Sequence, residues 1–318
     1  MHAAAINLRG GVSLRAARLR GQSIIEYVLI IAVIGLVIVF AGPGVAGAIR
    51  NQFNLVGNTL NSGTNGGTEG GGASGGGSAG ADSAAVQAAV AKDAKDWTLD
   101  EQEAVAKDIA KNGTSSIVYA KAKAAMDAGI KFTMKLTNGK TLEYRIIGIN
   151  HDDLADGSGK AGLTFEATND ALGEQRMNAT ETNTGGWEKS EIRDRLNSGD
   201  LWSILPAEIQ SKAKAVKKMT DNKGDGGVGT PTATTDKVFL VSATEVYGDS
   251  QGDGTQYEYY KFKGVSKSNH SEVSSVFGRW TRSVSQNGAG SFLYVSPYGD
   301  CRNVGATDAD RVHPAWCF

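Results

Sequence analysis

Residues 131–149 read KFTMKLTNGKTLEYRIIGI, and this stretch decides the fold of the C-terminal part of the chain. Apolar and polar residues alternate on both sides of Asn138-Gly139. The alternation predicts two strands that each turn one face to a core. Asn-Gly accepts the positive φ angles of a tight type I′ turn, so the two strands are predicted to pair as a hairpin.

The rest of the C-terminal part continues the pattern of short elements. Four more strands are predicted, over residues 163–166, 237–242, 257–262 and 292–295. A helix is predicted over 187–196. Long runs of Gly, Asn, Asp and Ser lie between these elements, so residues 130–318 are predicted to form a loop-rich α+β domain.

Helical patterns precede the hairpin, in residues 83–129. Three helices are predicted, over residues 83–94, 98–111 and 115–128. Thr98 followed by Glu101 is a capping-box pattern, which places a helix start at this threonine. Gly129 is predicted to end the third helix, because glycine accepts the left-handed conformation of a helix C-terminus.

A glycine-rich stretch, residues 61–82, precedes the helical segment. It holds ten glycines between Gly63 and Gly80 and reads as a flexible Gly/Ser linker. A phosphate-binding glycine loop is the alternative. That loop needs a strand before it, a helix after it and usually a lysine, and this context is missing.

An apolar run, residues 27–49, carries no charged residue. A helix of this length measures roughly 35 Å, enough to cross a bilayer core of about 30 Å. Four arginines and no acidic residue occupy residues 1–21, so the N-terminus is predicted to stay in the cytoplasm and the C-terminus to be exported. The whole chain of 318 residues has 33 Lys+Arg against 34 Asp+Glu, and this balance gives no indication of nucleic-acid binding.

The junction before the apolar run reads RGQSIIEY, residues 20–27. It resembles the type IV pilin superfamily, and specifically the Flp-type prepilins of tight-adherence systems. The resemblance implies cleavage after Gly21 by a prepilin peptidase, so that residues 1–21 are the leader and Gln22 is the first mature residue. It also implies a pilin helix over residues 22–60 in which Glu26, followed by Tyr27, takes part in filament assembly.

A pilin-type N-terminus implies further partners and a location. The chain would be a single-pass membrane protein before assembly, with other pilin subunits as partners through the helix, and would then reach the cell surface or pilus. Flp-type pilins are usually little longer than their helix, whereas about 235 residues follow the linker here. This difference favours a minor, tip or decorated subunit that displays a binding or adhesion domain.

Other routes by which the chain is exported or anchored remain open at this point. The residues AGA at 46–48 match the cleavage pattern of an ordinary secretory signal. A pseudopilin of a secretion system and an exported enzyme with a pilin-type anchor are the other two alternatives.

Residues 142–318 carry a second resemblance, which rests on the motifs WTRS at 280–283 and VHPAW at 312–316. This part is similar to an uncharacterised domain that is frequent in surface proteins of Gram-positive gut bacteria. It also resembles C-type-lectin-like domains, which implies a loop-rich α+β unit with ligand contacts in its C-terminal half. Trp280 and Trp316, which lie in the motifs, are expected in the core.

The last third of the chain supplies the candidate ligand-binding residues, because Tyr and Trp provide rigid amphipathic contact area. The candidates for an unknown extracellular ligand are Tyr294, Tyr298, Asp300 and Arg302. Cys301 and Cys317 are predicted to form a disulfide, since an exported chain meets oxidising conditions; two unpaired thiols are the alternative.

The best local cluster for an enzyme is His151-Asp152-Asp153, where carboxylates lie beside an imidazole. A solvated loop after a strand is the favoured interpretation, so no enzyme activity and no cofactor are expected. Asp-rich stretches at 152–156 and 249–253 lack the spacing of a known calcium loop, although Ca²⁺ is the one metal they would suit.

Overall fold

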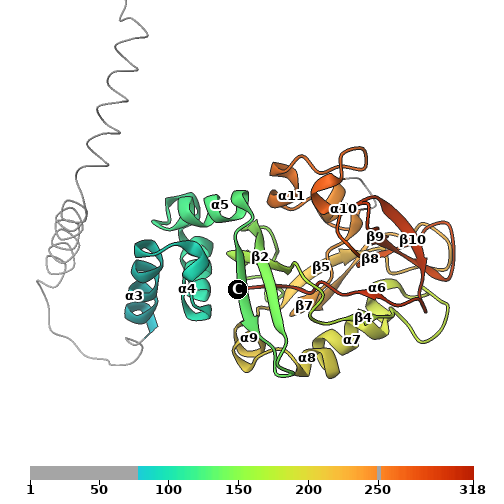
Figure 1. Ribbon diagram of the computed structural model, residues 1–318, viewed down its shortest axis with the longest axis horizontal. Coiled ribbons are helices and arrows are strands. Elements are labelled where there is room, and N and C mark those ends of the chain that lie inside the picture. The colour runs from blue at the N-terminus through green and yellow to red at the C-terminus, as the bar shows by residue number, and fades with distance from the viewer. Residues whose placement is uncertain (1–77, 249–251) are drawn as a thin grey trace, which may run out of the picture. The chain divides into compact units, whose positions relative to one another are not determined.

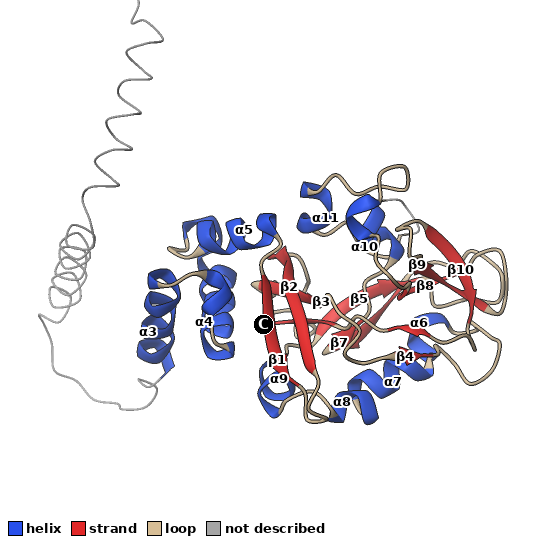
Figure 2. Ribbon diagram, in the orientation of Figure 1, coloured by secondary structure: helices blue, strands red, loops and turns tan. Residues whose placement is uncertain are grey.

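The computed structural model describes residues 78–248 and 252–318 (Figure 1). Their architecture is α+β, as the sequence predicts (Figure 2). The predicted leader, the pilin helix and most of the linker lie outside the described residues. Within the described part of the chain, no helix is long and apolar enough to cross a membrane.

Three helices come first: α3 (Ser78–Ala91), α4 (Leu99–Asn112) and α5 (Tyr119–Ala128). The predicted capping box opens α4, because the Thr98 hydroxyl accepts from the Glu101 amide and the Glu101 carboxylate accepts from the Thr98 amide. Gly129 ends α5 in the left-handed conformation, as predicted. These helices share one hydrophobic core with the strands that follow, so residues 83–129 and 130–318 pack together.

The predicted hairpin is present as β1 (Lys131–Lys135) and β2 (Thr141–Ile149), which pair antiparallel. The turn differs from the predicted type I′. Only Gly139 has a positive φ, of 83°, and Asn138 does not. The Gly139 amide donates to the Leu136 carbonyl, and the Leu136 amide donates to the Lys140 carbonyl. The connection is therefore a longer turn that closes on a left-handed glycine, a common alternative to the two-residue loop.

The first sheet has five strands in the order β1-β2-β3-β12-β7. The three strands that complete this sheet beyond the hairpin are β3 (Leu163–Ala167), β12 (Ala315–Cys317) and β7 (Val238–Phe239). Aromatic rings fill its core: Phe165 stacks on Trp316 at 5.9 Å between ring centroids, and Tyr144 lies 5.0 Å from Trp316. The C-terminal strand β12 thus lies between β3 and β7, and Trp316 is fully buried, as expected.

The second sheet has the order β10-β9-β8-β11-β4, and a separate hairpin joins β5 to β6. Their bounds are β4 (Glu174–Gln175), β5 (Val216–Thr220), β6 (Thr232–Asp236), β8 (Arg279–Val284), β9 (Ser291–Val295), β10 (Cys301–Gly305) and β11 (Asp310–Arg311). Trp280 of β8 is buried, as expected. Short helices connect the strands, namely α6 (Gly186–Lys189), α7 (Glu191–Asn197), α8 (Asp200–Ser203), α9 (Ala207–Lys212), α10 (Ala243–Tyr247) and α11 (Glu258–Phe262).

Two predicted elements are corrected. The strand predicted over 257–262 is wrong, because this stretch forms α11. The adjacent Tyr259 and Tyr260 are both buried, which a helix permits and a half-buried strand does not. The helix predicted over 187–196 is interrupted at Ser190, which is extended, and so it becomes α6 and α7.

Candidate functional site

The structure brings three of the four candidate ligand-binding residues together, on the turn between β9 and β10 and at the start of β10. The Arg302 guanidinium donates to the Asp300 carboxylate at 2.6 Å and lies 5.8 Å from the centre of the Tyr298 ring. The Ser296 and Arg302 side chains hold the pKa of Asp300 below its ordinary value. Tyr298 is 72% exposed, so its ring faces solvent.

The fourth candidate, Tyr294, lies within β9 opposite Arg302 of β10. Its ring packs on Trp280 with 6.5 Å between centroids. Partial burial raises the pKa of the Tyr294 hydroxyl. Tyr294 therefore supports the turn from the sheet and does not line the groove described next.

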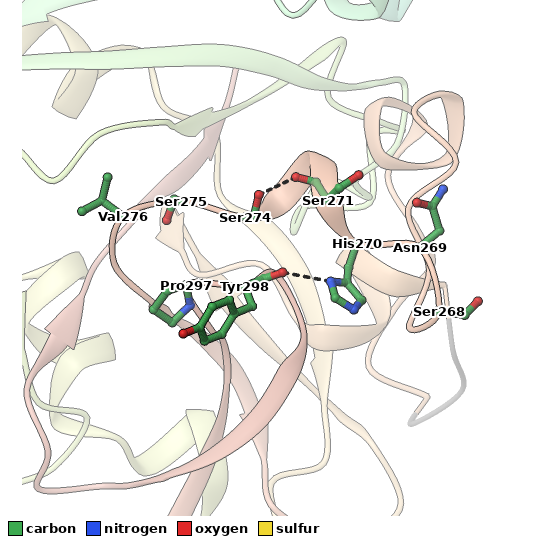
Figure 3. A pocket seen from close by; sticks show the side chains of 9 residues that line it. All are labelled: Ser268, Asn269, His270, Ser271, Ser274, Ser275, Val276, Pro297 and Tyr298. Carbon is green, nitrogen blue, oxygen red and sulfur yellow. Dashed lines mark hydrogen bonds between the residues drawn. The ribbon is translucent and has the colours of Figure 1, made fainter.

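A surface groove of about 880 Å³ lies beside this turn (Figure 3). The loop formed by residues 268–276 makes one wall, and Pro297 with Tyr298 makes the other. Most of the lining residues carry a hydroxyl, amide or imidazole group, although apolar atoms make up much of the accessible wall; the lining consists of Ser268, Asn269, His270, Ser271, Ser274, Ser275, Val276, Pro297 and Tyr298. We call this feature the 268–298 groove.

Contacts between the two walls fix the groove. His270 Nδ1 donates to the Tyr298 carbonyl at 3.0 Å, and Figure 3 shows this bond spanning the walls. Gly299 follows Tyr298 with a φ of 87°, and a Cβ at that position would lie 2.2 Å from the His270 carbonyl oxygen. The Tyr247 hydroxyl also donates to the Gly299 carbonyl at 2.5 Å. The close approach of the walls thus requires glycine at position 299.

The wall formed by residues 268–276 is not among the residues predicted from the sequence. This stretch reads SNHSEVSSV, which is typical of a solvent-exposed loop and gives no sign of a partner. The available signal was the apolar pair Val276-Phe277 after a run of polar residues, and both side chains are exposed. Their exposure places apolar surface next to the groove.

The cluster His151-Asp152-Asp153 does not stay together. Asp153 is exposed and pairs with Lys160 at 2.9 Å. His151 pairs with Glu258 at 3.0 Å and stacks on Tyr257. Asp152 points into the interior, so the expectation of a solvated loop holds for only part of the cluster.

A fully buried group of charges surrounds Asp152. Lys218 of β5 lies 2.6 Å from Asp152 and 2.7 Å from Glu245 of α10. Arg282 of β8 pairs with Glu245 through both nitrogens, at 2.5 and 2.8 Å. We call these four residues, Asp152, Lys218, Glu245 and Arg282, the buried quartet.

Electrostatics keep the two carboxylates of the quartet ionised. Burial alone would raise the pKa of Asp152, but Lys218 and His151 hold it well below the ordinary value. Burial likewise opposes ionisation of Glu245, and the cations Arg282 and Lys218 hold its pKa low. Two anions thus face two cations with a balanced charge, which is how buried charges are normally accommodated.

The predicted disulfide between Cys301 and Cys317 is wrong. Both residues are thiols in the structure, and they belong to different sheets, Cys301 to β10 and Cys317 to β12. The Cys317 thiol lies 3.5 Å from Asp152 and 3.4 Å from the Thr164 hydroxyl. Burial raises the pKa of Cys317 well above its ordinary value, so this thiol stays protonated.

Among residues 78–248 and 252–318, no group of three or more His, Cys, Asp or Glu residues is placed to hold a metal ion. In the predicted Asp-rich stretch 152–156, Asp152 and Asp153 pair with lysines, and Asp156 accepts from Ser158.

One comparison with known proteins gives a match. Residues 159–318 match the family described as "Domain of unknown function (DUF6273)". No curated protein matches the chain, and no solved structure matches it. The match begins before β3, so the three helices and the β1–β2 hairpin precede it, although β2 pairs directly with β3.

Proposed function

The chain belongs to the DUF6273 family, and we propose that it is a pilin or minor pilin subunit whose C-terminal domain binds an extracellular saccharide through the 268–298 groove. The observation that carries the binding proposal is the groove itself, where the exposed Tyr298 ring stands beside short hydroxyl and amide side chains. Delivery by a pilin-type N-terminus rests on the sequence junction at residues 20–27.

The chemistry of the groove favours a hydroxyl-rich partner. Sugar rings present C–H faces that pack on an aromatic ring, and Tyr298 offers such a ring at the groove wall. The amide of Asn269 and the hydroxyl of Ser275 already donate to the Gly264 and Phe277 carbonyls, and their oxygens remain as acceptors that suit sugar hydroxyls. Asp300 and Arg302 neutralise each other, so the turn gives no net charge that would select an ionic partner.

Affinity electrophoresis of the full chain in detergent tests the binding proposal. Gels that contain soluble dextran, mannan, xylan or hydroxyethylcellulose serve as probes. We expect at least one polysaccharide to retard the wild-type protein, and Tyr298→Ala to weaken this binding about tenfold or more. Phe262→Ala is the matched control, because Phe262 is also exposed, at 57%, and lies outside the groove.

The outcome separates a groove from general surface adhesion. Equal losses in Tyr298→Ala and Phe262→Ala would assign the binding to scattered exposed aromatics. Unretarded wild-type protein in every gel would remove saccharides of these classes as partners.

The proposal that a pilin-type N-terminus exports and anchors the chain has its own test. N-terminal sequencing of the mature protein from its native host is expected to start at Gln22, and Gly21→Ala is expected to leave the leader attached. A start at residue 49, after the AGA of residues 46–48, would instead support a secretory signal and would remove the pilin assignment. The groove proposal does not depend on this result.

A further inference from the structure

The buried quartet holds a lysine nitrogen in direct contact with an aspartate carboxylate. Lys218 Nζ lies 2.6 Å from Asp152 Oδ1, and Glu245 Oε1 lies 2.7 Å from the same nitrogen. The side chains of Lys218, Asp152 and Glu245 are exposed by only 2, 3 and 2%. An amine, a carboxyl carbon and a carboxylate that can carry protons are therefore held together away from water.

We propose that Lys218 and Asp152 condense to an intramolecular isopeptide bond, with Glu245 as the catalytic residue that moves the protons. The Lys218 Nζ–Asp152 Cγ bond forms, the Cγ–Oδ1 bond breaks, and water leaves. The ammonium group holds three hydrogens: one stays on the amide nitrogen, and two depart with Oδ1. The ion pair therefore contains every proton that the step needs, and no oxidant, reductant or cofactor takes part.

Glu245 is placed to carry these protons. Its Oε1 lies 2.7 Å from the Lys218 nitrogen, so it takes a proton from the ammonium transiently, against the low pKa that the two cations impose on it, and frees the amine for attack. Arg282 holds the carboxylate of Glu245 through two bonds and fixes its position. Two protons leave the nitrogen one after the other, Glu245 passes each of them to Oδ1 of Asp152, and Glu245 returns to its ionised form when water has left.

Donors surround the oxygen that would carry charge in the transition state. Asp152 Oδ2 accepts from the hydroxyls of Thr164 at 2.6 Å and Tyr257 at 3.0 Å, and from the Cys317 thiol at 3.5 Å. Such fixed donors stabilise the negative oxygen of a tetrahedral intermediate. The ring of Phe239 lies 4.2 Å from the Lys218 nitrogen and helps to exclude water, which favours condensation over hydrolysis.

Burial also supplies a driving force. A buried ion pair pays a large desolvation cost, whereas an amide is neutral and keeps its hydrogen-bond partners. The bond would join the loop after β2 to strand β5 across 66 positions of the sequence. It would therefore tie the first sheet to the β5–β6 hairpin, a useful property in a domain that experiences pulling force.

Mass spectrometry of the denatured full chain tests the bond. We expect the wild-type mass to be lower than the sequence mass by one water molecule, and digestion to release the peptide with Lys218 linked to the peptide with Asp152. Lys218→Arg is expected to restore the full mass, and the Glu245→Gln chain to accumulate largely unlinked. The neighbouring exposed lysine provides the control, because Lys217→Arg should keep the deficit.

The wild-type spectrum decides the question even where a variant fails to fold. A full wild-type mass with separate Lys218 and Asp152 peptides would overturn the proposal and leave a static ion pair. A water deficit that persists in Lys218→Arg would place the condensation elsewhere and would also overturn it.

Discussion

The buried quartet and the surface beside the 268–298 groove contain similar polar side chains, but these side chains have different roles. In the quartet, Arg282 has no exposed side-chain surface and all its bonds go to protein groups. At the start of β10, beside the groove, the side chain of Arg302 is 54% exposed and pairs with Asp300. Burial therefore decides the role of each arginine. Arg282 holds parts of the domain together, whereas Arg302 contributes to the exposed surface beside the groove.

The arginines themselves give the largest expected contrast. Arg282→Met leaves the Glu245 carboxylate buried without its main partner, which should lower the free energy of unfolding by roughly 3–5 kcal/mol. Arg302→Met breaks an exposed pair and should leave the free energy of unfolding almost unchanged. Urea unfolding followed by circular dichroism measures both. Equal losses of unfolding free energy in the two variants would contradict the different roles of the two arginines.

The core around the C-terminal strand gives the next effect. Trp316→Phe removes part of a fully buried ring that packs on Tyr144 and Phe165, so the domain should lose about 1–3 kcal/mol. Thermal unfolding measures this loss. An unchanged midpoint would mean that β12 contributes little to the sheet and that the core lies elsewhere.

Gly299, where the two walls of the groove meet, gives the next smaller effect. Gly299→Ala places a Cβ against the His270 carbonyl and forces a positive φ on alanine, which should cost roughly 1–3 kcal/mol of strain or separate the two walls. Saccharide binding should fall while the rest of the fold persists. Gly139→Ala is the control, since it meets the same backbone strain with open space around it. Unaltered binding in Gly299→Ala would show that the walls need not meet.

The smallest effect concerns pH. Burial opposes protonation of His151, but Glu258 and Asp152 raise its pKa above the ordinary value. The stabilisation from protonated His151 is therefore fully present below the unfolded-state pKa of about 6.5 and is lost as pH rises through the folded-state pKa. Unfolding curves at several pH values should show this loss in the wild type, and His151→Gln should flatten it. A stability that rises over the same pH range would contradict the pairing.

Local signals in the sequence predicted much of the fold. The capping box at Thr98, the glycine after α5 and the alternation around Asn138 each describe contacts within a few residues, and the structure confirms the elements they mark. The strand prediction for residues 257–262 was wrong because it used the local alternation of tyrosines. The structure forms a helix here, in which the tyrosines are buried against distant partners such as Glu166.

The sites were less accessible to prediction because their partners are far apart in the chain. Lys218 lies in a lysine-rich stretch, and nothing local distinguishes it from its exposed neighbour. Asp152 looked like part of a solvated loop until the fold placed Lys218 beside it. Of the groove, the sequence indicated the Tyr298 turn, whereas the opposite wall became visible only through the contact between His270 and this turn.

The most direct test of the account is the affinity of the full chain for a soluble polysaccharide, measured for the wild type and Tyr298→Ala together with their unfolding midpoints. The account predicts binding that falls about tenfold or more in Tyr298→Ala while the free energy of unfolding changes by less than about 0.5 kcal/mol. Binding that survives the substitution, or that falls only because the domain unfolds, would contradict a binding groove at this surface.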